Sequence, residues 1–330
     1  MGVIELKHGG GGRATSQLID IFAKHFDNEI LNGMEDSALL HLEGDAAFTT
    51  DSFVIEPYVF PGGDIGKLSV CGTVNDLVSR GARPLYLSSA FIIEEGFEIA
   101  ELEKIAASMA AAARQAGAGI VTGDTKVVGR GHADGVYINT AGIGRVELPG
   151  VSAHNARPGD KIIVTGSIGD HSIAILSARE GMDFTADVKS DCAPLGGFID
   201  ALLPFAGQVH TMRDATRGGL AAVLNEIAKA AEVKIRIYED KVPVKPEVKS
   251  ICDVLGFDVL TLANEGKLVI FAPAESADGI LAAIKSDPLG RDASVIGEVT
   301  EGKAMVTMET VFGTERIIDI PYGELLPRIC

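Results

Sequence analysis

The sequence feature that most restricts the fold is an alternation of strand-like and helix-like segments that runs through the chain twice. In the first half, apolar residues recur at helical spacing and predict helices over residues 15–27, 66–79 and 98–117. Runs rich in β-branched and aromatic or other apolar residues predict strands over 46–55, 85–93 and 119–124. Such an alternation is typical of α/β or α+β domains.

A polar stretch between Pro149 and Pro158 divides the chain, and the alternation restarts after it. At about 150 residues per domain, 330 residues accommodate two domains. For the second half we predict strands over 161–166, 267–273 and 293–299, helices over 170–180, 217–231 and 274–286, and a short strand pair before the C-terminal end.

The predicted organisation therefore has four parts. They are a glycine-rich arm and helix at residues 1–40, an N-terminal domain at 41–150, a C-terminal domain at 151–318 and a mobile tail at 319–330. Pro321, Gly323 and Pro327 favour irregular backbone in this tail.

The charge balance limits the partners that this chain can bind. It carries 46 acidic residues against 29 basic ones, a formal net charge of −17. Nucleic-acid-binding surfaces need clustered Lys and Arg, so we expect no nucleic-acid partner. An acidic protein can still bind ATP, because a divalent cation such as Mg²⁺ can lie between its carboxylates and the phosphates.

The sequence shows no sign of export or membrane insertion. Its first residues lack the charged-then-apolar layout of a signal peptide, and no apolar run reaches the roughly 18 residues of a membrane span. The four cysteines lack C-x-x-C spacing, which fits a reducing compartment. We expect a cytoplasmic protein with no membrane partner.

Aspartates next to turns and strand ends are the first candidates for a functional site. Carboxylates at the ends of elements can converge on a hard cation such as Mg²⁺. Each of them alone is better explained as a cap or turn residue, but the set is more informative than its members. The set consists of Asp45, Asp51, Asp76, Asp124 and Asp214.

Two glycine clusters, Gly9 to Gly12 and Gly218-Gly219, are candidates for phosphate contact, because consecutive glycines let backbone N–H groups approach a phosphate. Neither matches the Walker or the dinucleotide-binding pattern. The first cluster is also consistent with a flexible arm.

Three further residues stand out. Lys126 and Glu265 each lie near a strand end, where an ammonium and a carboxylate could serve a proton transfer, although unrelated surface positions explain them too. Cys330 is the last residue of the sequence, and a thiol on a Pro-containing tail could carry a group between active centres. An accidental terminal cysteine is the alternative.

Together these segments resemble a known family. In chain order, HGGGG, GDAAFTTDSFVI, CGTVNDLVSRGARP, VTGDTKV, MRDATRGGL, ANEG and the final PRIC are similar to the HypE hydrogenase maturation proteins, which are carbamoyl dehydratases. The resemblance covers essentially the whole chain. The middle motifs are shared with selenophosphate synthetase and aminoimidazole ribonucleotide synthetase, whereas PRIC and the GDTKV form specify HypE.

The resemblance implies a two-domain synthetase-like fold, with ATP in a cleft between the domains and N-terminal domains that pair in a homodimer. It implies that Asp45, Asp76 and Asp214 bind Mg²⁺. The implied ATP-binding residues are Gly9, Gly10, Gly11, Gly12, Asp51, Asn75 and Asp124.

The resemblance also implies a reaction. A partner carbamoyltransferase loads Cys330 with a carbamoyl group, and the enzyme dehydrates this thiocarbamate to a thiocyanate with ATP. The cyanide then passes to an iron scaffold complex of two maturation proteins and serves the nickel–iron hydrogenase site. We hypothesise that Glu265 accepts a proton while Lys126 steadies developing charge, or that these roles are exchanged.

Two alternatives stay open at this point. A selenophosphate synthetase relies on a Cys or Sec near the glycine-rich loop, and this sequence has none there. A non-catalytic scaffold could dock maturation partners through its tail, and such a protein would work without the Cys330 thiol.

Overall fold

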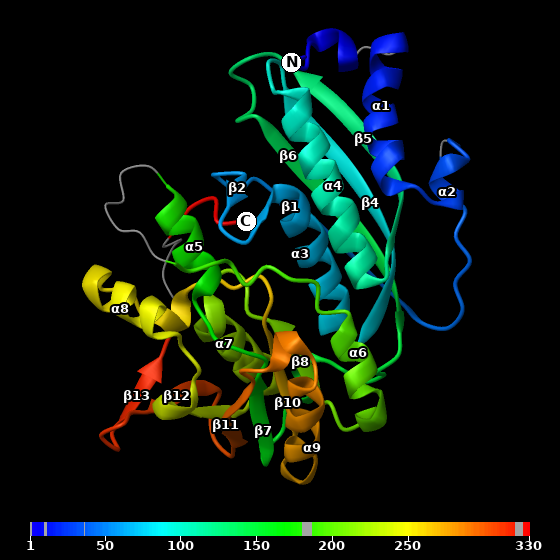
Figure 1. The fold of residues 1–330 in the computed structure, drawn as a ribbon. Coiled ribbons are helices and arrows are strands. Elements are labelled where there is room, and N and C mark those ends of the chain that lie inside the picture. Colours follow the sequence, from blue (N-terminus) through cyan, green and yellow to red (C-terminus); the bar gives the residue numbers. More distant parts are fainter. Residues whose placement is uncertain (1, 10–11, 36, 180–186, 321–325) are drawn as a thin grey trace.

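The computed structural model describes residues 2–9, 12–35, 37–179, 187–320 and 326–330 (Figure 1). It consists of two halves, each built on its own sheet with helices packed against it, so the predicted α/β (α+β) class is confirmed. The first sheet ends at Val146 and the second begins at Asp160. None of the described helices is long and apolar enough to span a bilayer.

The first half is a four-stranded sheet in the order β1-β6-β4-β5. Neighbouring strands are antiparallel except the parallel pair β4 and β5. Helices α3 and α4 cover one face, and α1 lies beside α4 (Figure 1). The elements are α1 (Gly12–Phe26), α2 (Glu29–Asn32), β1 (Ala46–Phe53), β2 (Val59–Phe60), β3 (Gly63–Asp64), α3 (Ile65–Ser79), β4 (Ala82–Glu94), α4 (Ile99–Ala116), β5 (Gly119–Val128) and β6 (Val136–Val146).

The other face of this sheet is open. Residues along β1 alternate between exposed and more buried positions, as the period of two along a strand requires. Phe48 is 70% exposed, and its cross-strand neighbour Ile143 lies on the same open face. An apolar side chain of this size is left in water on a face that no described helix of the chain covers.

The second half is a seven-stranded sheet in the order β13-β12-β9-β11-β7-β10-β8, in which only β12 and β9 run parallel. Strand β10 is buried along nearly its whole length. The elements are β7 (Asp160–Val164), α5 (Asp170–Ala178), α6 (Gly197–Leu202), β8 (Thr211–Asp214), α7 (Gly219–Ala231), β9 (Lys234–Tyr238), α8 (Pro246–Leu255), β10 (Leu268–Pro273), α9 (Ala274–Lys285), β11 (Ser294–Thr300), β12 (Met305–Glu309) and β13 (Glu315–Ile318).

The two halves share one hydrophobic core. Val74 and Leu102 of the first half belong to the same buried cluster as Phe198 and Ile270 of the second. A further cluster forms between α7 and the second sheet. The halves are therefore joined by packing that includes contacts between α3 and β8. This packing fixes the positions of the elements that line the space between the halves.

The sequence predicted most elements but missed several. All twelve individually predicted helices and strands occur with bounds shifted by a few residues, and the short strand pair before the tail is β12 with β13. Strands β2, β3, β6, β8 and β9 and helices α2, α6 and α8 were not predicted. In β6, Gly142 and Gly144 interrupt the strand pattern; a Cβ at Gly144 would lie 2.7 Å from the Arg83 carbonyl oxygen, so close packing requires glycine there.

Candidate functional site

A cleft of about 490 Å³ lies between the two halves. The first half contributes β1 and α3, and the second contributes β8 and the loop that leads into α7. Its polar lining combines carboxylates, hydroxyls and guanidinium groups. The lining includes Thr49, Asp76, Ser79 and Arg80 from the first half and Arg213, Asp214, Thr216, Arg217 and Glu226 from the second, with Ser152 and His154 from the segment between the sheets.

Two of the predicted metal ligands meet across this cleft. The Thr49 hydroxyl donates to Asp76 Oδ2 at 2.8 Å, and the Ser79 hydroxyl donates to Asp214 Oδ1 at 3.2 Å. Burial and the nearby Asp76 raise the pKa of Asp214 to about 6. Burial also raises the pKa of Asp76, with Asp51 adding to the effect. These carboxylates repel one another and would be relieved by a bound cation.

Asp51 belongs to the same cluster. It lies on β1, accepts a hydrogen bond from the Ser52 amide at 2.8 Å, and has a pKa raised by burial. The positive charge of Arg217 acts on both Asp51 and Asp76. The structure thus brings together three of the five predicted aspartates.

Arg80, Arg213 and Arg217 supply positive charge in the cleft, and none of them is among the predicted site residues. Arg80 donates to the Val151 carbonyl at 2.5 Å, and Arg213 pairs with Glu226 at 2.7 Å. All three cleft arginines stand inside motifs that were already singled out, VSRGARP and MRDATRGGL, so their signal was present in the sequence. Guanidinium groups beside carboxylates suit a polyanion that arrives with a metal ion.

The second glycine pair shapes the turn into α7. Gly218 and Gly219 have φ angles of +75° and +61°. A Cβ at Gly219 would lie 2.5 Å from the Leu262 carbonyl oxygen. The pair therefore sets the path of the loop that carries Arg217 into the cleft.

Glu265 is buried next to this cluster. Its side chain is 2% exposed, and Oε1 has no hydrogen-bond partner among the described residues. Burial raises the pKa of Glu265 well above its usual value, and Cys192, Asp191, Asp214 and Asp51 add to the effect. Burial therefore favours the protonated form of this carboxyl, and positive charge entering the site would favour the ionised form, which can accept a proton.

Asn75 joins the two halves. Its amide nitrogen donates to the carbonyls of Ala193 at 3.1 Å and Glu265 at 3.3 Å, and its oxygen accepts from the Leu195 amide at 2.8 Å. Both amide protons and one lone pair are thus used on backbone of the second half. The predicted ATP contact of Asn75 remains a prediction, and the geometry assigns its side chain to the junction.

Asp124 and Lys126 lie elsewhere in the chain. They form an exposed ion pair of 2.6 Å on β5. The strand register runs from Ser52 through Asn139 and Ala90 to Asp124, three strand spacings or about 14 Å. Within one chain, therefore, the structure does not bring Lys126 to Glu265, which interacts with Asp51 on the far side of the sheet.

The remaining predicted residues do not join the cleft cluster. Gly9 packs against Val127 on β5, and Gly12 begins α1. Gly10 and Gly11 lie outside the described residues. Asp45 is exposed and precedes β1, six residues or about 20 Å of extended strand from Asp51.

The carboxylates that meet in the cleft fit a magnesium ion that arrives with phosphates. Within the described ranges, no group of three or more His, Cys, Asp and Glu side chains is arranged to hold a metal ion. Mg²⁺ usually takes one or two carboxylates and completes its shell with water and phosphate oxygens. Asp76 and Asp214, with Asp51 nearby, provide such hard oxygen donors, whereas Asp45 is not among them.

Cys330 is docked beside the end of β1. Its carbonyl accepts a hydrogen bond from the Val54 amide at 3.2 Å, and Ile329 is 3% exposed. His171 Nε2 lies 2.8 Å from the Ile329 carbonyl oxygen and Nδ1 lies 2.7 Å from the Ser190 hydroxyl. The Ser190 hydroxyl also accepts a hydrogen bond from the Cys192 amide at 3.0 Å, and Cys192 is one of the groups that raise the pKa of Glu265.

The comparisons with known proteins cover both halves. Residues 34–146 match the family model of the AIR synthase related protein N-terminal domain, and residues 157–308 match that of the C-terminal domain. Carbamoyl dehydratase HypE of Rhizobium leguminosarum bv. viciae is 52% identical over all of this chain and 95% of its own length. This chain belongs to the HypE family.

Solved structures of the HypE family agree with this assignment and confirm the predicted synthetase-like fold. A crystal structure of the hydrogenase maturation protein HypE in complex with ATP has a TM-score of 0.95 and 48% identity, covering 99% of both chains. A HypE chain from a crystal structure of a HypE–HypF complex has a TM-score of 0.82 and 51% identity, covering 93% of this chain and all of that one.

Proposed function

We propose that this chain is an ATP-dependent carbamoyl dehydratase that acts on a carbamoyl group carried by its own Cys330. The observation that carries the proposal is the combination of full-length similarity to the HypE family with a docked Cys330 and a cleft of carboxylates and arginines. A relative crystallised with ATP supports ATP as the co-substrate.

The proposed reaction converts R–S–CO–NH₂ and ATP into R–S–CN, ADP and phosphate. The amide oxygen attacks the γ-phosphorus and ADP leaves, so that a poor leaving group becomes a phosphate. The C–O bond then breaks as nitrogen loses its protons and the C≡N bond forms. Arg80, Arg213 and Arg217 are proposed to bind the phosphates, and magnesium, when bound, would offset their charge.

Glu265 is proposed to take a proton from the carboxamide nitrogen. Its burial among negative groups raises its pKa. Its high proton affinity makes it a strong acceptor once the site ionises it. Cationic charge arriving with the substrate is the change that would ionise Glu265.

Lys126 cannot assist in the same chain, since it lies on the opposite, open face of the first sheet. We propose that two copies pair through this face and that Asp124 and Lys126 act on the site of the second copy. The exposed Phe48 and the uncovered sheet face support such pairing.

The proposed partners follow from the same chemistry. A carbamoyltransferase must load Cys330, and the HypE–HypF complex of relatives supports a HypF protein in this role. An iron scaffold complex of two maturation proteins is the proposed acceptor of the cyanide, whose destination is the nickel–iron hydrogenase site.

The test is the intact mass of chain carbamoylated on Cys330, with and without Mg-ATP. We expect a loss of the mass of one water that requires Mg-ATP and Cys330. Glu265→Gln should lower the rate at least about 100-fold, the range of general acid–base catalysis. Cys330→Ser is the control that carries no group.

Two outcomes would contradict the proposal. No mass loss in the wild type, with ATP shown to bind and the partner copy present, would favour a scaffold that docks partners through its tail. Full-rate dehydration by Glu265→Gln would remove Glu265 as the proton acceptor while leaving the reaction in place.

A further inference from the structure

The docked end of the tail is held by polar contacts from both halves of the molecule. We propose that the Arg328 side chain is a latch that holds residues 326–330 in the docked position, and that Arg179 positions the backbone behind it. The latch itself does not depend on the proposed dehydration. Only its effect on catalysis rests on that proposed function. According to this proposal, Arg328, two residues before Cys330, controls the position of Cys330.

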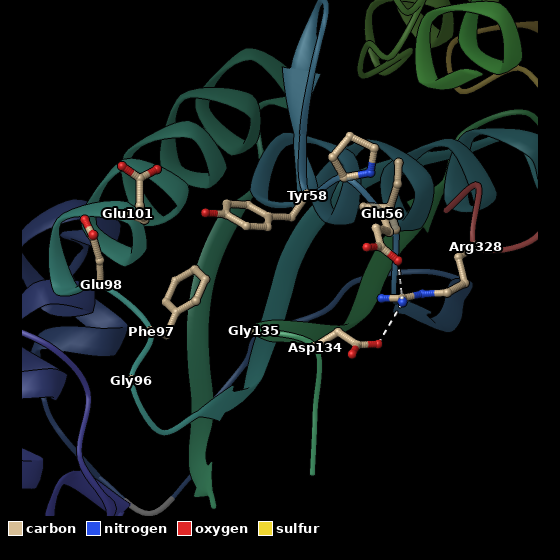
Figure 2. A pocket seen from close by; sticks show the side chains of 11 residues that line it. Glu56, Tyr58, Gly96, Phe97, Glu98, Glu101, Asp134, Gly135 and Arg328 are labelled. Atoms are coloured by element: carbon tan, nitrogen blue, oxygen red, sulfur yellow. Dashed lines mark hydrogen bonds and ion pairs between the residues drawn. The ribbon is translucent and has the colours of Figure 1, made fainter. Parts of the chain in front are cut away.

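Arg328 makes three contacts with the first half. Its Nη1 lies 2.7 Å from Glu56 Oε2 and 2.7 Å from Asp134 Oδ2, and Nε donates to the Val54 carbonyl at 2.9 Å. Figure 2 shows the guanidinium between the two carboxylates, with dashed lines to both. One planar cation thereby joins the segment after β1 to the loop before β6.

The guanidinium lies at one side of a pocket of about 680 Å³. In Figure 2 the opposite side of this pocket carries the aromatic pair Tyr58 and Phe97, with Glu98 and Glu101 beyond them. The acidic lining suits a cation, and the cation found there is the side chain of the chain's own tail. We therefore identify Arg328 as the occupant of the Glu56 and Asp134 side of the pocket.

Backbone contacts place the tail alongside the segment after β1. The amides of Val54 and Glu56 donate to the carbonyls of Cys330 and Arg328, both at 3.2 Å. The pairing is antiparallel, because the register runs forward on one segment and backward on the other. These bonds depend little on side chains, so they set the direction of the tail but do not distinguish Arg328 from another residue.

The second half clamps the same backbone. Arg179 Nη2 donates to the carbonyls of Pro327 at 2.6 Å and Arg328 at 3.0 Å. The Ile329 carbonyl can only accept, so the proton of His171 lies on Nε2, and Nδ1 accepts from the Ser190 hydroxyl. The tail is thus wedged between the two halves, beside β2 and α5 (Figure 1).

The backbone of Arg328 explains why a latch is needed. Its φ is +53°, in the left-handed region, which is unfavourable for a residue with a Cβ. The ion pairs that offset this cost are exposed, since Glu56 and Asp134 are 64% and 61% accessible. Exposed ion pairs are weak, so the docked position is reversible, as a carrier thiol that must also meet a second protein requires.

Reactivity of the Cys330 thiol tests the latch without any reference to catalysis. The other three cysteines are at most 3% exposed, so a maleimide applied to the native full-length chain should label Cys330 first. The double variant Glu56→Gln with Asp134→Asn removes two exposed ion pairs. We expect labelling about 2- to 30-fold faster than in the wild type.

Three comparisons sharpen the test. Arg328→Gln should match the double variant, whereas Arg328→Lys should retain part of the protection, because it keeps the charge but loses the fork geometry. Added salt should speed labelling in the wild type and much less in the double variant. Glu103→Gln, which removes the exposed pair with Lys24 in the same half, is the matched control and should label at the wild-type rate.

Hydrogen exchange at Val54 and Glu56 gives a second readout, because the tail carbonyls protect these amides. We expect faster exchange there in the variants, with an unchanged melting temperature. If both labelling and exchange stay at the wild-type rate in the double variant and in Arg328→Gln, the latch does not exist.

The consequence for catalysis is tested separately. In the variants we expect faster loading of Cys330 by a HypF-type carbamoyltransferase and slower dehydration per loaded chain. Faster labelling combined with a wild type that never dehydrates would support the latch and contradict the proposed function. Normal dehydration by the wild type combined with unchanged labelling in the variants would support the proposed function and contradict the latch.

Discussion

At the scale of single residues, buried carboxyl groups in the cleft lower the stability of the folded chain when they are ionised. Asp214 lies near Asp76 and is shielded from water, so its folded pKa is about 6, above its ordinary value of 3.8. A carboxyl with a raised pKa destabilises the folded state once it ionises, because ionisation is easier in the unfolded chain. Ionised Asp214 therefore destabilises the folded protein at the position where a cation would bind.

This cost predicts a pH dependence for Asp214→Asn in the absence of divalent ions. Folded Asp214 keeps its proton to higher pH than the unfolded chain does, so wild-type stability should fall as pH rises from about 4 to about 6. The variant should lack this contribution and gain up to about 3 kcal/mol over the wild type at pH 7. Denaturant unfolding across this pH range measures the difference.

Asp278→Asn is the control for this measurement, since Asp278 is exposed on α9 and away from the cleft. A variant at Asp214 whose stability advantage stays the same from pH 4 to pH 7 would show that the carboxyl is not shifted. Restoring Mg-ATP should reduce the advantage, because a cation favours the ionised wild-type carboxyl.

At the scale of elements, α3 is the part that organises the site. Thirteen of its fifteen residues are buried, because the first sheet, α4 and the second half surround it. Its polar residues Asn75, Asp76 and Ser79 therefore face the junction and the cleft. Gly66 near its start lets α4 approach, since a Cβ there would lie 2.4 Å from the Ile105 carbonyl oxygen.

Gly66→Ala should therefore destabilise the protein. Alanine is the better helix former by about 1 kcal/mol, but the clash is with backbone, which cannot turn away, and overpacking of this kind costs about 1–3 kcal/mol. We expect a net loss, measured by denaturant unfolding. Ala111→Gly at an exposed site of α4 calibrates the intrinsic difference between the two residues.

A net gain in stability for Gly66→Ala would mean that α3 and α4 can separate by the width of a methyl group. The cleft would then be less rigid than its packing indicates. If the close approach of α3 and α4 is fixed, the larger side chain of Gly66→Val should lower the stability further than Gly66→Ala does.

On the scale of the whole molecule, one chain contains two separated groups of predicted site residues. Asp51, Asp76, Asp214 and Glu265 gather around the junction of the halves. Asp124 and Lys126 lie on the open face of the first sheet. A second copy seated on that face is the arrangement that we propose to unite them.

Phe48→Glu tests this pairing. In a symmetric pair each copy loses one apolar contact and gains one buried charge, so the effect is doubled. We expect the dimer dissociation constant to rise at least about 100-fold, measured by analytical ultracentrifugation. Phe312→Glu, at a 90% exposed residue of the second half, is the matched control.

If Phe48→Glu sediments as the wild type does, the open face is not the dimer interface. Monomeric wild-type protein that still dehydrates would show instead that Lys126 has no role in a second copy. Either result would favour the alternative interpretation, in which Lys126 and Asp124 form an exposed surface ion pair without a catalytic role.

The sequence by itself determined the family, the two-part alternation of strands and helices and the individual site candidates, because these depend on local periodicity and on short motifs. Only the tertiary structure decided which candidates meet. Strand pairing and domain packing placed Asp51, Asp76 and Asp214 around one cleft, moved Lys126 to another face and used Asn75 between the halves. Contacts between residues far apart in the chain, such as Arg328 with Glu56 and Asp134, leave no local pattern, and so no motif could predict how the tail is held.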